Sequence, residues 1–187
     1  MMKLSMALRR HGRRSPAIAV AYSALVGLAG PTRAVPEFMT YDATERLVRL
    51  TVIARYNDTN SGYNLNGSIR GGHRVTVPLG WRVQVTFTNR DVVPHSLGLV
   101  RESRLVPIRI EKPALSGAAT HRLVTGMPPH DHDDFAFVAA LPGSYLLACG
   151  VPGHAVNGGY LQFVIWAGTA VPTYEGGAAI PMSAGRE

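Results

Sequence analysis

The stretch LPGSYLLACGVPGH, residues 141–154, places a turn, a strand and a tight loop one after another. The proline and glycine near its start indicate the turn, and the apolar run that follows to Cys149 indicates the strand. Cys149 is the only cysteine of the chain, so it is a buried hydrophobe, a reactive thiol or a metal ligand. His154, five positions later on the same loop, favours the metal, because thiolate and imidazole are both ligands of transition metals.

A third candidate ligand is His95, which follows a stretch of alternating apolar and polar residues at 81–88. A single histidine is usually a solvated or hydrogen-bonded side chain. However, a histidine after one strand and a Cys/His loop after a later strand can meet at one end of a sandwich. Two histidines, one cysteine and a weak axial group make up a blue-copper site. We therefore expect His95, Cys149 and His154 to bind one copper ion that alternates between Cu(I) and Cu(II).

These residues carry a resemblance to a known family. Over residues 63–166 the chain resembles the sulfocyanin branch of the cupredoxins, which are small blue copper proteins. The YNLNG run at 63–67 is similar to that family's early strand and turn, and VPHS at 93–96 is similar to its first-histidine segment. The CGVPGHA loop at 149–155 is the most specific match. The resemblance implies an all-β, antiparallel Greek-key sandwich, copper on His95, Cys149 and His154, and electron carriage outside the cytoplasm between redox proteins of the cytochrome or terminal-oxidase type.

The chain departs from the family at Gly159, where the family places an axial methionine. Met127 and Met182 lie far off in the sequence, and Gln162 is displaced by three positions. Because the axial bond is long and weak, its loss should leave copper bound. The ion is then three-coordinate, takes a backbone carbonyl such as that of Pro94, or admits water or a small ligand.

Electron transfer is the function that we expect, and two alternatives stay open. One is a copper site with an open position that binds or transforms a small ligand, and the other is a copper-delivery module. Thiol enzymes are not favoured, because the catalytic base of such enzymes usually comes from a separate part of the chain and disulfide exchange needs a second cysteine. We therefore expect that the protein is not an enzyme. The electron should pass through the edge of His154, within an apolar docking patch formed by Pro152, Gly153, Ala155 and Val156.

The N-terminal residues 1–34 predict a signal peptide or an N-terminal membrane anchor, because a basic start precedes an apolar run of roughly 15 residues. This segment holds six basic residues and no acid, which leaves +1 of the formal net charge of +7 for the rest of the chain. The high isoelectric point is therefore no indication of nucleic-acid binding. We expect a monomer in the periplasm or on the outer face of the cytoplasmic membrane, tethered there if the segment stays uncleaved.

The remaining chain predicts one cupredoxin domain at 35–167 and a loose tail at 168–187. Glycine, proline and Asn/Asp clusters separate its strand-like runs at spacings typical of an all-β sandwich. The runs are 46–56, 75–77, 81–88, 96–100, 121–124, 134–139, 143–149 and 160–167.

Two smaller hypotheses concern single positions. Ser96, directly after the first candidate histidine, is placed to connect the two ligand-bearing segments by a hydroxyl hydrogen bond to the Cys149 loop, although an ordinary solvated serine is equally consistent. The HDHDD run at 130–134 contains His130 and His132 and offers ligands for a second metal, but a solvated loop is the more common structure for such a run.

Overall fold

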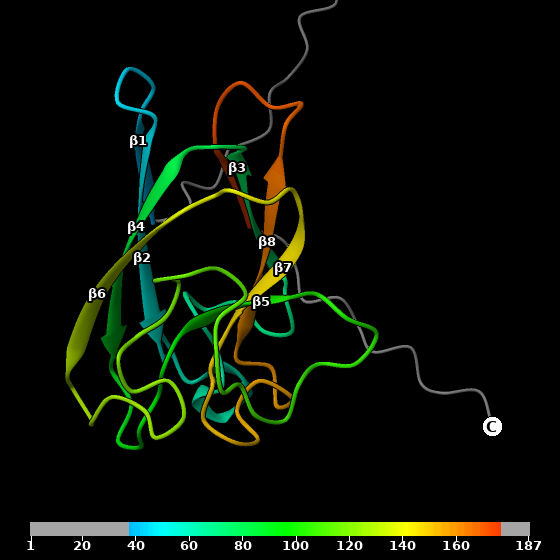
Figure 1. The fold of residues 1–187 in the computed structure, drawn as a ribbon. Helices are drawn as coiled ribbons and strands as arrows, with labels where there is room; N and C mark the ends of the chain where they lie inside the picture. The colour runs from blue at the N-terminus through cyan, green and yellow to red at the C-terminus, as the bar shows by residue number, and fades with distance from the viewer. Residues whose placement is uncertain (1–37, 177–187) are drawn as a thin grey trace, which may run out of the picture. The chain divides into compact units, whose positions relative to one another are not determined.

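The computed structural model describes residues 38–176, and nearly all of its regular structure is β-strand (Figure 1). One short 3-10 turn, Thr59–Gly62, interrupts the strands. The strands are β1 Met39–Asp42, β2 Leu47–Ala54, β3 His73–Pro78, β4 Arg82–Asn89, β5 Gly98–Arg101, β6 His132–Val138, β7 Gly143–Ala148, β8 Tyr160–Trp166 and β9 Thr173–Gly176. The predicted signal peptide or anchor at 1–34 lies outside the described residues. Within 38–176 no helix is long and apolar enough to span a bilayer.

The strands form two sheets with the orders β1-β2-β4-β6 and β5-β7-β8-β3-β9. The predicted all-β sandwich is confirmed, but both sheets are mixed rather than purely antiparallel. The parallel pairs are β2 with β4, where Leu50 lies opposite Val85, and β3 with β8, where Val75 lies opposite Phe163. Alternation of side chains along a strand reports which residues face inward and not which way a neighbour runs, so the sequence pattern could not distinguish the two pairings.

The larger of two apolar clusters joins the two sheets. On β4 the inward side chains Val83, Val85 and Phe87 are fully buried, and their polar neighbours are more exposed. The facing sheet contributes Phe163 and Leu147, which belong to the same cluster. Burial of such a cluster is the main favourable term in folding. It also fixes the ends of β4 and β7, the strands that precede the candidate ligands.

Three local expectations differ from the structure. The predicted strand at 121–124 is a series of turns, and Leu123 is buried there because it packs in a second apolar cluster. Strands β1 and β9 were not expected. The tail is not loose throughout, since Thr173–Gly176 pairs with β3 and the Tyr174 hydroxyl lies 3.0 Å from His73 Nδ1.

Candidate metal centre

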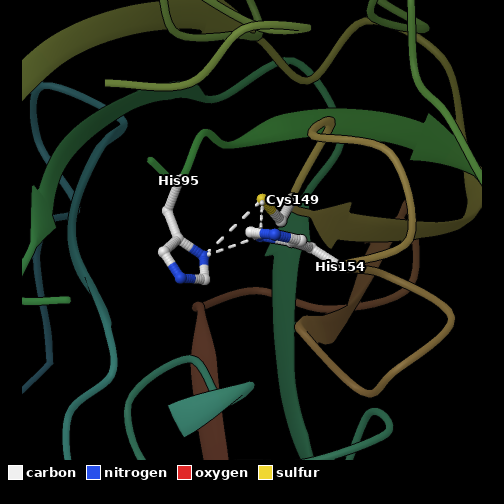
Figure 2. Close-up of side chains that lie close together, drawn as sticks. All are labelled: His95, Cys149 and His154. Carbon is white, nitrogen blue, oxygen red and sulfur yellow. Dashed lines mark hydrogen bonds between the residues drawn. The ribbon is translucent and has the colours of Figure 1, made fainter. Parts of the chain in front are cut away.

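The three predicted ligand residues come from loops at one end of the sandwich, the lower end in Figure 1. His95 lies between β4 and β5, where its backbone exchanges two hydrogen bonds with Met127. Cys149 directly follows β7, and His154 lies on the loop from β7 to β8. Figure 2 shows the three side chains pointing toward one another. The loops therefore bring His95 next to Cys149 and His154, which lie 54 and 59 positions later in the chain.

The spacing of the donor atoms suits a trigonal metal site. Cys149 Sγ lies 3.7 Å from His95 Nδ1 and 3.5 Å from His154 Nδ1, and the two Nδ1 atoms are 3.3 Å apart. Metal–nitrogen bonds of about 2.0 Å and metal–sulfur bonds of about 2.3 Å, the values for zinc, give separations of about 3.5 and about 3.7 Å at angles of 120°. The observed separations are close to these values, so the three donors can bind one first-row ion. They are also the one group of three or more His, Cys, Asp or Glu ligands found within residues 38–176.

Burial keeps both histidines in the form that binds metal. Burial lowers the pKa of His95, which is 2% exposed, and burial together with the nearby His95 lowers the pKa of the half-buried His154 to about 4. Burial raises the pKa of the Cys149 thiol, although backbone N–H groups of Ser96 and Val151 act in the opposite direction. Metal binding at this site therefore releases the thiol proton.

Ser96 connects the two ligand-bearing segments, as hypothesised from the sequence. Its hydroxyl accepts a hydrogen bond from the Gly150 N–H at 2.9 Å and donates one to the Leu123 carbonyl at 2.6 Å. Its own backbone N–H points at Cys149 Sγ, at 3.4 Å. The serine is fully buried, so these bonds are protected from water.

Gly159 lies next to Cys149 and His154. A Cβ atom at this position would be 3.8 Å from Cys149 Cβ and 3.2 Å from the His154 carbonyl oxygen. A longer side chain at 159 would therefore start beside the candidate site. Met127, which seemed remote in sequence, is 2% exposed and its backbone pairs with His95.

Three residues near the site were not identified from the sequence. Asp91 and Arg55 form a hydrogen-bonded chain behind His95, and the Tyr63 ring meets the His154 ring edge-on at 5.1 Å. The Asn-Gly motif at 63–67 pointed to the right loop but not to the position of the tyrosine ring. Arg55 lies 36 positions from Asp91, and nothing in the local sequence joins them.

Two further expectations can be located. Ala155 is 1% exposed and packs inward, so it is not part of a docking patch, whereas Pro152 and Val156 are exposed. In the HDHDD run, His132 lies 3.9 Å from Asp131, and Asp133 accepts instead from His121. Residues 132–134 belong to β6, and these side chains lie in separate pairs and do not form a converging ligand set.

Comparison with known proteins places the chain in a family. The Sulfocyanin (SoxE) domain matches residues 35–175. A sulfocyanin from Sulfolobus acidocaldarius is 28% identical over 128 residues, and the match covers 63% of this chain and 63% of that protein.

Two solved structures show more distant similarity. Reduced auracyanin from Roseiflexus castenholzii is 20% identical, with a TM-score of 0.46 over 63% of this chain and 96% of that one. Rusticyanin from Thiobacillus ferrooxidans is 18% identical, with a TM-score of 0.46 over 69% and 86%. Because the sulfocyanin domain spans most of its length, the chain belongs to the sulfocyanin family of cupredoxins, whose cofactor is one copper ion.

Proposed function

We propose that this protein carries single electrons by means of one copper ion bound to His95, Cys149 and His154. The observation that carries the proposal is the convergence of one sulfur and two nitrogen donors at 3.3 to 3.7 Å from one another. A trigonal His₂Cys set with a long, weak axial bond is typical of electron-transfer sites. The ion supplies the one-electron Cu(I)/Cu(II) change.

The protein's contribution is to hold the three donors still and to limit access to them. Cys149 and His95 are buried, and hydrogen bonds with Ser96 and Asp91 hold them in place, so the donor positions need little change between the two oxidation states. His154 is the half-buried ligand, and the exposed Pro152 and Val156 lie close to it in the loop. We propose this edge as the place where electrons enter and leave.

The partners follow from the same proposal. An apolar rim around an exposed ligand edge supports brief encounters rather than permanent complexes. We propose redox proteins of the cytochrome or terminal-oxidase type as partners of a monomeric carrier. We further propose that it works outside the cytoplasm, in the periplasm or on the outer face of the cytoplasmic membrane, and that it is not an enzyme.

Gly159 supports one rival function. Glycine supplies no side chain as an axial ligand, which is compatible with an open site that binds or transforms a small ligand. A copper-delivery module is a second rival, and such a protein would lose Cu(I) readily to an acceptor.

The visible and paramagnetic-resonance spectra of the copper-loaded full chain, with and without azide, test these functions. A carrier gives an intense thiolate-to-copper band and a narrow copper hyperfine splitting, and azide changes neither. A weak or shifted band that responds to azide would contradict the carrier and favour the open site.

A further inference from the structure

The two ring nitrogens of His95 lie next to different groups. Nδ1 points at Cys149 and His154, while Nε2 lies 2.9 Å from Oδ2 of Asp91. The His95 and Asp91 side chains are only 2% and 5% exposed. A carboxylate can only accept a hydrogen bond, so the ring proton resides on Nε2 and the lone pair of Nδ1 is free. This is the tautomer that a metal ion on Nδ1 requires.

Hydrogen bonds hold both the carboxylate and the backbone of Asp91 in place. Its Oδ1 accepts hydrogen bonds from Arg55 Nη1 and from the Val92 N–H, both at 2.7 Å. Its backbone N–H donates to Asn89 Oδ1 at 2.9 Å. Burial acts to raise the pKa of Asp91, yet bonds from Arg55 and His95 outweigh it and lower the pKa. The carboxylate is therefore a fixed anion behind the inner histidine.

Arg55 connects this anion to the surface. The arginine side chain is 35% exposed, and its second terminal nitrogen contacts Asp58, a side chain that is 90% exposed. Its backbone takes a left-handed φ of 50°, which is uncommon for a residue with a side chain, and its N–H is bound to the Asn64 carbonyl. The loop therefore holds Arg55 in an unusual conformation that directs its guanidinium at Asp91.

We propose that Asp91 is a positioning residue that orients His95 for copper, and that the charges of Asp91 and Arg55 set the reduction potential in opposite directions. A carboxylate that is hydrogen-bonded to a metal-ligating imidazole raises the basicity of that imidazole. The negative charge stabilises Cu(II) more than Cu(I), because the interaction scales with the charge of the ion. Asp91 therefore lowers the potential, and the cation of Arg55 partly offsets that effect. This inference rests on the proposed copper site.

The opposite signs separate this role from a purely structural one. If the network served only to hold the loop, loss of either member would loosen His95 in the same manner and move the potential in the same direction. Asp58 offers a matched control. It contacts the same guanidinium, but from solvent, where charges are strongly screened.

The test is a spectroelectrochemical titration at pH 7 of the copper-loaded full chain and three variants. Asp91→Asn keeps the size of the side chain and removes the charge, and it should raise the potential. Arg55→Met removes the cation and should lower it. Asp58→Asn should leave it close to that of the unmodified protein. An unchanged potential in Asp91→Asn, or shifts of the same sign in Asp91→Asn and Arg55→Met, would overturn the proposal.

A copper-free measurement keeps the test independent of the metal. In the apo protein, nitrogen NMR of the histidine rings should show His95 protonated on Nε2, with a slowly exchanging proton that is lost or speeds up in Asp91→Asn. Protonation on Nδ1 would refute the orienting role. If Asp91→Asn does not fold, the direction of the Arg55→Met shift decides, and a rise or no change refutes the proposal. An unmodified protein without the blue band would refute the copper site instead.

Discussion

The two candidate histidine ligands occupy contrasting halves of one site. His95 lies on the inner half, 2% exposed, with a backbone bridge to Met127 on one side and the Asp91 carboxylate on the other. His154 lies on the outer half, half-buried, on a loop that contains Pro152 and Gly153. The inner half thus fixes the geometry of the site, and the outer half leaves one ligand edge within reach of a partner.

The Cys149 sulfur lies next to both histidines, so replacing this residue should have the largest effect on the copper site. Cys149→Ser replaces the thiolate that gives the site its colour, and the intense visible band should disappear completely. The absorption spectrum of the copper-loaded variant checks this. A Cys149→Ser protein that kept the band would show that the copper is bound elsewhere.

Paired glycine substitutions test whether the halves differ. His154→Gly leaves a gap open to solvent, so added imidazole should enter it and restore most of the visible band. His95→Gly leaves a buried gap without access, and it should recover far less colour at the same imidazole concentration. Titration of both variants with imidazole, followed by absorption, makes the comparison. Equal recovery would mean that the two histidines are equally accessible.

The hydrogen bonds of Ser96, which connect the His95 segment to the Cys149 loop, should contribute to folding stability. Ser96→Ala removes the partner of the Gly150 N–H and of the Leu123 carbonyl, both close to the buried centre. A buried polar group left without a partner costs about 1–3 kcal/mol, so the free energy of unfolding of the apo protein should fall by at least that much. Urea unfolding measures it, and Ser103→Ala, at an exposed serine, serves as the control. A loss no larger than that of the control would contradict the connecting role.

Gly159 offers the smallest but most informative change. A Cβ atom at this position would lie 3.8 Å from Cys149 Cβ and 3.2 Å from the His154 carbonyl oxygen, so Gly159→Met should place a thioether close to the ion. We expect a shifted reduction potential and no response to azide, with the copper still bound. Gly159→Leu, which has similar bulk and no sulfur, is the matched control. If neither variant shifts the potential, position 159 does not face the metal.

The sequence predicted the central strands, and it singled out the three candidate ligands that the fold brings together, for a physical reason. Strands such as β4 have one buried face, which produces the alternation of Val83, Val85 and Phe87. The Cys149 loop is local, so its two ligand types can be read within six residues. Strands β1 and β9 are four-residue edge strands whose side chains are mostly exposed, and such strands carry no alternating pattern.

What the sequence could not indicate is the environment of the ligands. The bond from Arg55 to Asp91 and the bridge from Met127 to His95 depend on tertiary folding, which brings distant loops to one end of the sandwich. Asp91 lies only four positions before His95, but whether a nearby carboxylate meets a histidine depends on the turn between them. The same limit explains the error at 121–124, where burial of Leu123 arises from packing and not from a strand.

The separation of the donors along the chain has a consequence for the order in which the protein matures. His95 and Cys149 are 54 positions apart, and joining the ends of a segment of that length costs roughly 3.5 kcal/mol of chain entropy. Cys149 and His154 both lie on the connection from β7 to β8, late in the sequence of the domain. Because packing of the sheets offsets this cost, we expect copper to bind a chain whose sheets have already formed.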